Sequence, residues 1–210
     1  MPEGQLGRRT LFVAACTIWI GWRAPVSAAE EPAAIAPVRD LIAGLIVVMK
    51  AGTAVPFEQR FTLLAPVVDR TFDLGVILQE SIGPAWETLP ADQQKMLTDA
   101  FRRYTIASYV NSFDAFNGQR FDIAPTTRTV GNQQIVQTKI IPPKGEGHEL
   151  DYVMRQTGDG WRVVDVLADG AISRVAVQRS DFRRLMASGG AAALAESLRA
   201  KSAALSDGMS

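Results

Sequence analysis

Few side chains in this 210-residue chain have the type and spacing that catalysis requires. Asp165 is the strongest candidate, because strand alternation predicts that it shares a face with Trp161, Val163 and Leu167. A carboxylate buried on such a face can act as a general base, as in isomerases with a small cone-shaped fold. A buried acid is more often a partnered structural residue. We therefore keep an enzyme with Asp165 as base as an alternative interpretation.

The remaining residues with reactive side chains form no known catalytic motif. His148, the single histidine, follows a glycine-rich loop and is interpreted as a surface residue at a strand end. One histidine does not make a zinc site. The sequence contains no glycine-rich phosphate loop, GxSxG elbow, HExxH or SxxK motif. We therefore expect no catalytic residues, no metal and no cofactor.

The segment 1–29 predicts a secretory signal peptide. Arg8 and Arg9 precede an apolar run at residues 11–22, and small residues follow it. This run of about a dozen residues is shorter than the ~20 that span a bilayer. The arginine pair leaves the general and the twin-arginine export routes both open, and a lipobox-like stretch ends at Cys16. We expect export to the periplasm.

The composition excludes several classes of function. Removing residues 1–29 takes three arginines and one glutamate from 22 basic and 22 acidic residues, leaving a formal charge of −2. Such a balance does not build the basic stripe that nucleic-acid binding requires. No cysteine remains for a disulfide or a thiolate metal site. No second apolar run is long enough to span a membrane.

The chain pattern predicts one domain in residues 37–205, after a flexible leader at 30–36 and before a tail at 206–210. Apolar residues at helical spacing predict helices from Val38 to Gly52, from Pro56 onward with a kink or break at Pro66, over 74–82, over 90–112, over 180–188 and over 191–205. Alternating patterns predict strands over 120–124, 133–141, 148–156, 161–167 and 171–175. The predicted fold class is α+β, with helices packed on one face of a curved antiparallel sheet.

Apolar side chains on one face of several strands oppose an apolar face of the long helix. Val136 and Ile140 share a strand face, and Phe101 and Tyr104 share a helix face. These residues either pack against one another as a filled core or line a cavity. The pattern does not distinguish these two arrangements.

The chain resembles the MlaC, or toluene-tolerance auxiliary, family of periplasmic carriers that serve an ABC lipid transporter. The resemblance covers about Val38 to Leu205 and rests on the order and spacing of short motifs. These are Phe72-Asp73-Leu74, Trp86, Gln93-Gln94, Phe101, Tyr109 with Phe113, Trp161-Arg162-Val163-Val164-Asp165-Val166, Gly170, Ser173, Arg179-Ser180-Asp181-Phe182 and the helix from Gly189 to Leu198. Two departures, an interrupting Ala171 and Gln178 in place of an Asn-Tyr pair, are similar to the hopanoid-biosynthesis-associated HpnM branch.

The resemblance implies a cone of helices and sheet with an apolar pocket that holds a phospholipid or a hopanoid-type lipid. It also implies a monomer with transient membrane contact that exchanges lipid with membrane-bound ABC-transporter and MCE-type components. The expected pocket wall is Leu74, Ile77, Phe101, Tyr104, Tyr109, Phe113, Val136, Ile140, Tyr152, Met154 and Val163. A further alternative is a non-carrier accessory protein of hopanoid metabolism, which would have a filled core.

Overall fold

The computed structural model describes residues 31–208. The predicted signal peptide, residues 1–29 with Cys16, lies outside the described residues. The first helix, α1 (Ile35–Ala51), begins inside the segment that was predicted as a flexible leader. The reason is burial, because Ala34 and Ile35 are fully excluded from solvent. Apolar side chains therefore order this part of the leader against the domain.

Three more helices and a short 3₁₀ turn precede the sheet. They are α2 (Phe57–Thr71), α3 (Leu74–Ile82), the turn η1 (Gly83–Thr88) and α4 (Ala91–Ser112). α2 continues through Pro66, where the sequence predicted a kink or a break. Pro66 is exposed, and so is Thr62, whose carbonyl loses its helical partner, so water can solvate that carbonyl.

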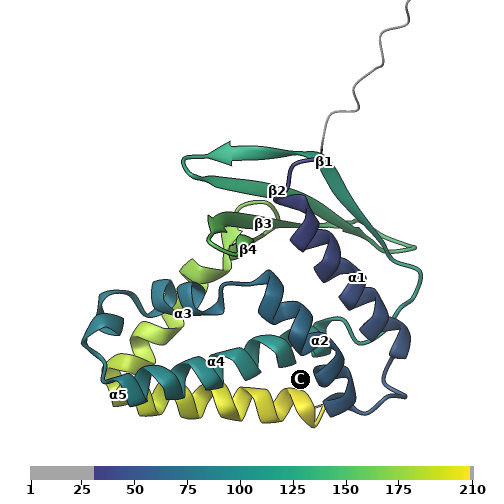
Figure 1. Ribbon diagram of the computed structural model, residues 1–210. Helices are drawn as coiled ribbons and strands as arrows, with labels where there is room; N and C mark the ends of the chain where they lie inside the picture. The colour runs from purple at the N-terminus through teal and green to yellow at the C-terminus, as the bar shows by residue number, and fades with distance from the viewer. Residues whose placement is uncertain (1–30, 209–210) are drawn as a thin grey trace, which may run out of the picture. The chain divides into compact units, whose positions relative to one another are not determined.

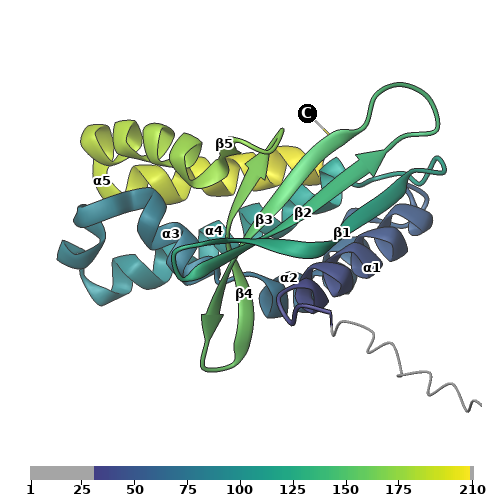
Figure 2. The ribbon, with the colours of Figure 1, turned by 90° about the horizontal axis from the view of Figure 1, so that it is seen from above.

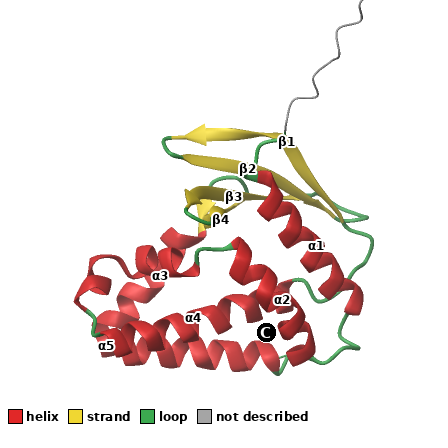
Figure 3. Cartoon of the chain, in the orientation of Figure 1, coloured by secondary structure: helices red, strands yellow, loops and turns green. Residues whose placement is uncertain are grey.

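The strands form a five-stranded antiparallel sheet in the order β1-β2-β3-β4-β5. Their bounds are β1 (Arg120–Val130), β2 (Gln133–Ile141), β3 (His148–Thr157), β4 (Gly160–Ala168) and β5 (Ile172–Ser173). Figures 1 and 2 show this sheet lying across the helices, and Figure 3 shows the separation of strands from helices. The predicted α+β class, with helices on a curved antiparallel sheet, is confirmed.

The last helix, α5 (Arg174–Ser206), starts earlier than the sequence predicted. A strand was expected up to Val175, but β5 ends at Ser173, whose hydroxyl accepts a hydrogen bond from the backbone N–H of Ala176 at 3.0 Å. This side-chain cap begins the helix. Non-helical backbone angles at Gly189 and Gly190 kink α5, at the position where the sequence predicted a break. α5 packs alongside α4 (Figure 1).

The apolar core lies between the sheet and the helices. Its largest fully buried side chains include Tyr152, Phe101, Leu41, Leu64 and Leu194. None of the helices in residues 31–208 has both the length and the apolar character needed to cross a bilayer.

Candidate functional site: a cavity between the sheet and three helices

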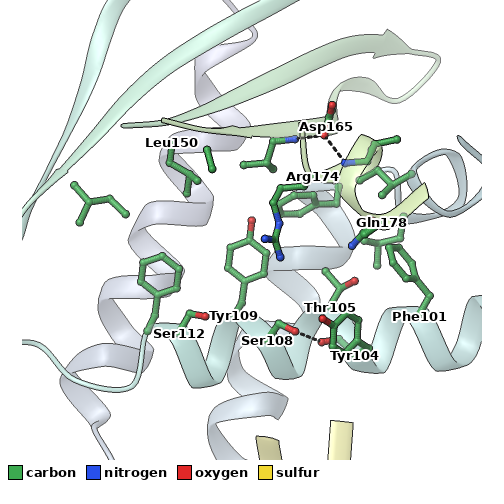
Figure 4. A pocket seen from close by; sticks show the side chains of 18 residues that line it. Phe101, Tyr104, Thr105, Ser108, Tyr109, Ser112, Leu150, Asp165, Arg174 and Gln178 are labelled. Atoms are coloured by element: carbon green, nitrogen blue, oxygen red, sulfur yellow. Dashed lines mark hydrogen bonds between the residues drawn. The ribbon is translucent and has the colours of Figure 1, made fainter. Parts of the chain in front are cut away.

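A cavity of about 360 Å³ lies between α3, α4, the first turns of α5 and one end of the sheet. Its size falls within the range of pockets that hold small ligands. The residues lining it are Phe72, Leu74, Ile77, Phe101, Tyr104, Thr105, Ser108, Tyr109, Ser112, Phe113, Ile140, Leu150, Asp165, Val166, Ala168, Arg174, Val175 and Gln178. Figure 4 shows these side chains converging on one space.

α4 forms the longest wall of the cavity. Phe101, Thr105, Ser108 and Ser112 recur every three or four residues, which places them on one face of the helix. This face is mixed, with hydroxyl groups among aromatic rings. The Ser108 hydroxyl donates to the Tyr104 carbonyl at 2.8 Å, so that hydroxyl is satisfied within the helix itself.

Aromatic contacts hold the apolar part of the cavity wall in place. The Tyr109 and Phe113 rings stack at 6.0 Å with an interplanar angle of 10°, and Phe72 lies tilted against Tyr109 at 5.5 Å. Phe113 in turn contacts Phe121 of β1 at 6.2 Å. At the other side, Phe101 meets Phe182 edge to face at 6.2 Å. Such pairs fix ring orientation beyond what burial alone provides.

Burial disfavours ionisation of two tyrosines, one in the cavity wall and one in the core. Burial raises the pKa of Tyr109, which lines the cavity, and raises that of its neighbour Tyr152 in the core. The guanidinium of Arg174 lies beside the Tyr109 ring (Figure 4), and its positive charge partly opposes the rise in the pKa of Tyr109. Both phenols therefore stay neutral at physiological pH, and the wall offers hydroxyl groups and no phenolate.

Asp165 lies in the cavity wall, but its carboxylate serves the backbone. One oxygen accepts from the Val166 N–H at 2.8 Å and from the Val175 N–H at 3.0 Å, and the other accepts from the Ser173 hydroxyl. Figure 4 draws the contacts to the two N–H groups as dashed lines at the edge of the cavity. The carboxylate therefore ties β4 to the start of α5.

A β-bulge changes the face on which Asp165 lies. Asp165 pairs with Val153 and Val163 pairs with Met154, so Val164 is an extra residue in β4. Val166, rather than Asp165, therefore shares the helix-facing side with Val163. The strict alternation that predicted Asp165 beside Val163 does not hold across this bulge.

The structure brings seven of the eleven predicted pocket residues around the cavity. These seven are Leu74, Ile77, Phe101, Tyr104, Tyr109, Phe113 and Ile140. The other four, which do not line it, are Val136, Tyr152, Met154 and Val163. They lie on the helix-facing side as predicted, but toward the other end of the sheet, where they are fully buried in the core.

Sequence reasoning missed several lining residues. Thr105 and Ser112 could have been found from their spacing with Phe101 on α4, but only apolar residues were weighed as pocket wall. Arg174 and Gln178 were hidden because residues 171–175 were predicted as a strand. The side chain of Gln178 reaches the cavity only because α5 begins at Arg174.

Residues 31–208 contain no cluster of three or more His, Cys, Asp or Glu side chains that could hold a metal ion. His148, the first residue of β3, is exposed. A second hollow beside Asp69 and Arg102 contains a two-pronged ion pair between these residues, with N–O distances of 2.6 and 2.8 Å. The charges of Asp69 and Arg102 therefore neutralise each other.

Comparison with known proteins places this geometry in a family. The family model described as the MlaC protein matches residues 39–200. A solved structure of the phospholipid-binding protein from Ralstonia solanacearum, in complex with a phospholipid, is similar with a TM-score of 0.72. The match covers 83% of this chain and 99% of that chain at 20% sequence identity. No curated protein matches the sequence.

Proposed function

The chain belongs to the MlaC family, and from that premise we propose that it is a periplasmic carrier that binds one lipid in the cavity. The observation that carries this proposal is the cavity of about 360 Å³, which aromatic and aliphatic side chains line on both the helix and the sheet side. The similar protein from Ralstonia solanacearum was solved with a phospholipid, which supports a lipid as the ligand here.

A carrier of this kind has a simple physical basis. Each buried CH₂ group stabilises the bound state by about 0.8 kcal/mol of free energy. Releasing a 16-carbon chain into water would therefore cost on the order of 12 kcal/mol. Spontaneous movement of a lipid between two membranes is therefore slow. A cavity lined by side chains such as Phe113, Ile140 and Leu150 keeps the acyl chain out of water during transit.

The family and the sequence motifs support a proposal for the partners and the cargo. We propose that membrane-bound ABC-transporter and MCE-type components deliver and receive the lipid, and that the N-terminal segment directs export. The cargo is a phospholipid or a hopanoid-type lipid. The second possibility rests on the resemblance of Ala171 and Gln178 to the HpnM branch.

The contacts of Asp165 support an enzyme less well than they support a binding protein. All three of its hydrogen bonds go to the residue next to it or to the start of α5. A general base needs an oxygen that is available to the substrate proton. We therefore propose a binding protein rather than an enzyme.

Lipid transfer between vesicles tests this function. Donor vesicles carry a fluorescent phospholipid and a quencher that the protein does not bind, and acceptor vesicles carry neither. We expect the purified protein to increase the rate of fluorescence recovery in proportion to its concentration. A rate equal to that without protein would contradict the carrier function. A variant with a filled cavity, Ala168→Phe, serves as the matched control.

A further inference from the structure

Among the described residues that line the cavity, Arg174 carries the one positive charge. Arg174 is the first residue of α5, and Figure 4 shows its guanidinium beside Tyr109 and above the hydroxyl groups of α4. The side chain is exposed on its other side, so it marks the opening of the cavity to solvent.

The charge of Arg174 has no protein partner among residues 31–208. No carboxylate oxygen of these residues lies within 4.0 Å of its guanidinium. The one acid in the cavity wall, Asp165, is occupied by Val166, Ser173 and Val175. Arg174 also stands at the N-terminal, positive end of a helix, where the dipole disfavours a cation. An anion in the cavity mouth would relieve both effects.

Two neutral donors face the same space. The Thr105 hydroxyl is buried in the cavity wall and has no hydrogen-bond partner in the described part of the chain. The Ser81 hydroxyl donates to the Ile77 carbonyl at 2.7 Å and shares that proton with the Gln178 amide oxygen at 3.1 Å, while the Gln178 amide nitrogen donates to none of the described residues. Figure 4 shows that nitrogen directed into the cavity. A buried donor without an acceptor is costly, and a bound ligand is one way to satisfy it.

Guanidinium, amide and hydroxyl donors together match the oxygens of a phosphate group. A guanidinium can donate two parallel hydrogen bonds to a phosphate, and such charge-assisted bonds are about twice as strong as neutral ones. We propose that Arg174, Gln178 and Thr105 bind the headgroup phosphate of the cargo lipid. The cargo is then a phosphate-bearing lipid, with its chains toward Leu150, at the other end of the cavity from Gln178 (Figure 4).

This inference rests on the proposed carrier function, and a pair of lipids separates the two. The probes are phosphatidylglycerol and diacylglycerol with the same fluorescent acyl chain, each titrated with the purified full-length protein. We expect tighter binding of phosphatidylglycerol. Equal affinity for the two lipids would leave the carrier function standing and overturn the phosphate site. Binding of neither lipid would overturn both.

Substitution of the cation then tests the site itself. We expect Arg174→Gln to weaken phosphatidylglycerol binding about tenfold or more and to leave diacylglycerol binding unchanged. Arg183→Gln is the matched control, because Arg183 is an exposed arginine of the same helix outside the cavity lining. Phosphatidylglycerol binding by Arg174→Gln equal to that of the control would overturn the proposal.

Thr105→Val provides a second, independent reading. The substitution removes the hydroxyl and keeps the shape of the side chain. We expect phosphatidylglycerol affinity to fall about fivefold, with diacylglycerol affinity unchanged. An equal loss for both lipids would mean that Thr105 only shapes the cavity, and it would remove this residue from the phosphate site.

Discussion

The helix-facing side of the sheet has two ends, and they differ in what they contact. At one end the strand residues are fully buried against the helices, and these are Val136, Met154 and Val163, with buried Tyr152 at the boundary beside its strand partner Val166. At the other end the strand residues on the same face line the cavity, and these are Ile140, Leu150, Val166 and Ala168. Each of β2, β3 and β4 contributes to both ends. We call them the core end and the cavity end.

The element opposite the sheet makes the difference. At the core end, the strands pack against buried apolar side chains of the helices. The junction between α2 and α3 adjoins both ends, because the Asp73 N–H donates to the Val163 carbonyl at 2.9 Å while Phe72 and Leu74 line the cavity. At the cavity end, the strands face hydroxyl groups of α4 and the first turn of α5, with Arg174 and Gln178. Apolar strand residues therefore form a filled core or a cavity wall according to their partners, not according to their own type.

The largest expected effect separates the two ends by stability. Met154→Ala at the core end should lower the free energy of unfolding by about 2–5 kcal/mol, because the buried site cannot collapse fully. Leu150→Ala borders existing space and is only half-buried, so its loss should be below about 2 kcal/mol. Denaturant unfolding measures both values. Equal losses would contradict the distinction between the ends.

The sequence predicted most helices and strands correctly, but it did not predict which sheet residues belong to the core end and which to the cavity end. The strand patterns and the spacing in α4 identified the helix-facing residues, including Ile140 and Phe101. They did not identify which of these meet a cavity, because that depends on elements distant in the chain. The bulge at Val164 was not predicted, since it depends on how β4 pairs with β3. The cap at Ser173 was not predicted either, since the contact of Ser173 with Asp165 joins residues that are apart in the sequence. The cap at Ser173 makes Arg174 the first residue of α5.

The second prediction concerns the joint between β4 and α5 at the cavity end. Asp165→Asn removes the negative charge, so the hydrogen bond from the Val175 N–H loses its charge assistance and the Ser173 hydroxyl must accept from the new amide instead of donating. We expect a loss of about 1–3 kcal/mol in stability with lipid still bound. Asp169→Asn, at an exposed neighbouring aspartate, is the matched control. A variant with unchanged stability would show that this carboxylate is not structural.

The third prediction fills the cavity end. Ala168→Phe places an aromatic ring in a space that is lined but unfilled by protein. We expect lipid affinity to fall at least about tenfold, which corresponds to ~1.4 kcal/mol, while thermal stability changes little. Ala187→Phe, on an exposed position of α5, is the control for an added ring. Full lipid binding by Ala168→Phe would mean that the lipid lies elsewhere.

The smallest expected effect lies on the face of the sheet that points away from the cavity. Asp151 pairs with Leu167 on the sheet, and burial raises its pKa above the ordinary value of 3.8. The folded state therefore favours the protonated carboxyl group over the ionised one. The stability that the protonated form contributes is present at low pH and is lost as the pH rises through the raised pKa.

Asp151→Asn removes this ionisation. We expect the variant to have a higher melting temperature than the wild type at pH 7, with the difference vanishing below about pH 3.8. Lipid affinity should not change, because Asp151 does not line the cavity. A difference in melting temperature between variant and wild type that stays the same at every pH would contradict burial of the ionised Asp151 carboxylate as its cause.

Mass spectrometry of an organic extract from the purified full-length protein tests most directly whether the cavity holds a lipid. We expect about one lipid per protein in the wild type, and a clear depletion in Ala168→Phe but not in Ala187→Phe. A wild-type protein that carries no lipid and takes up none when phospholipid is offered would contradict the carrier function.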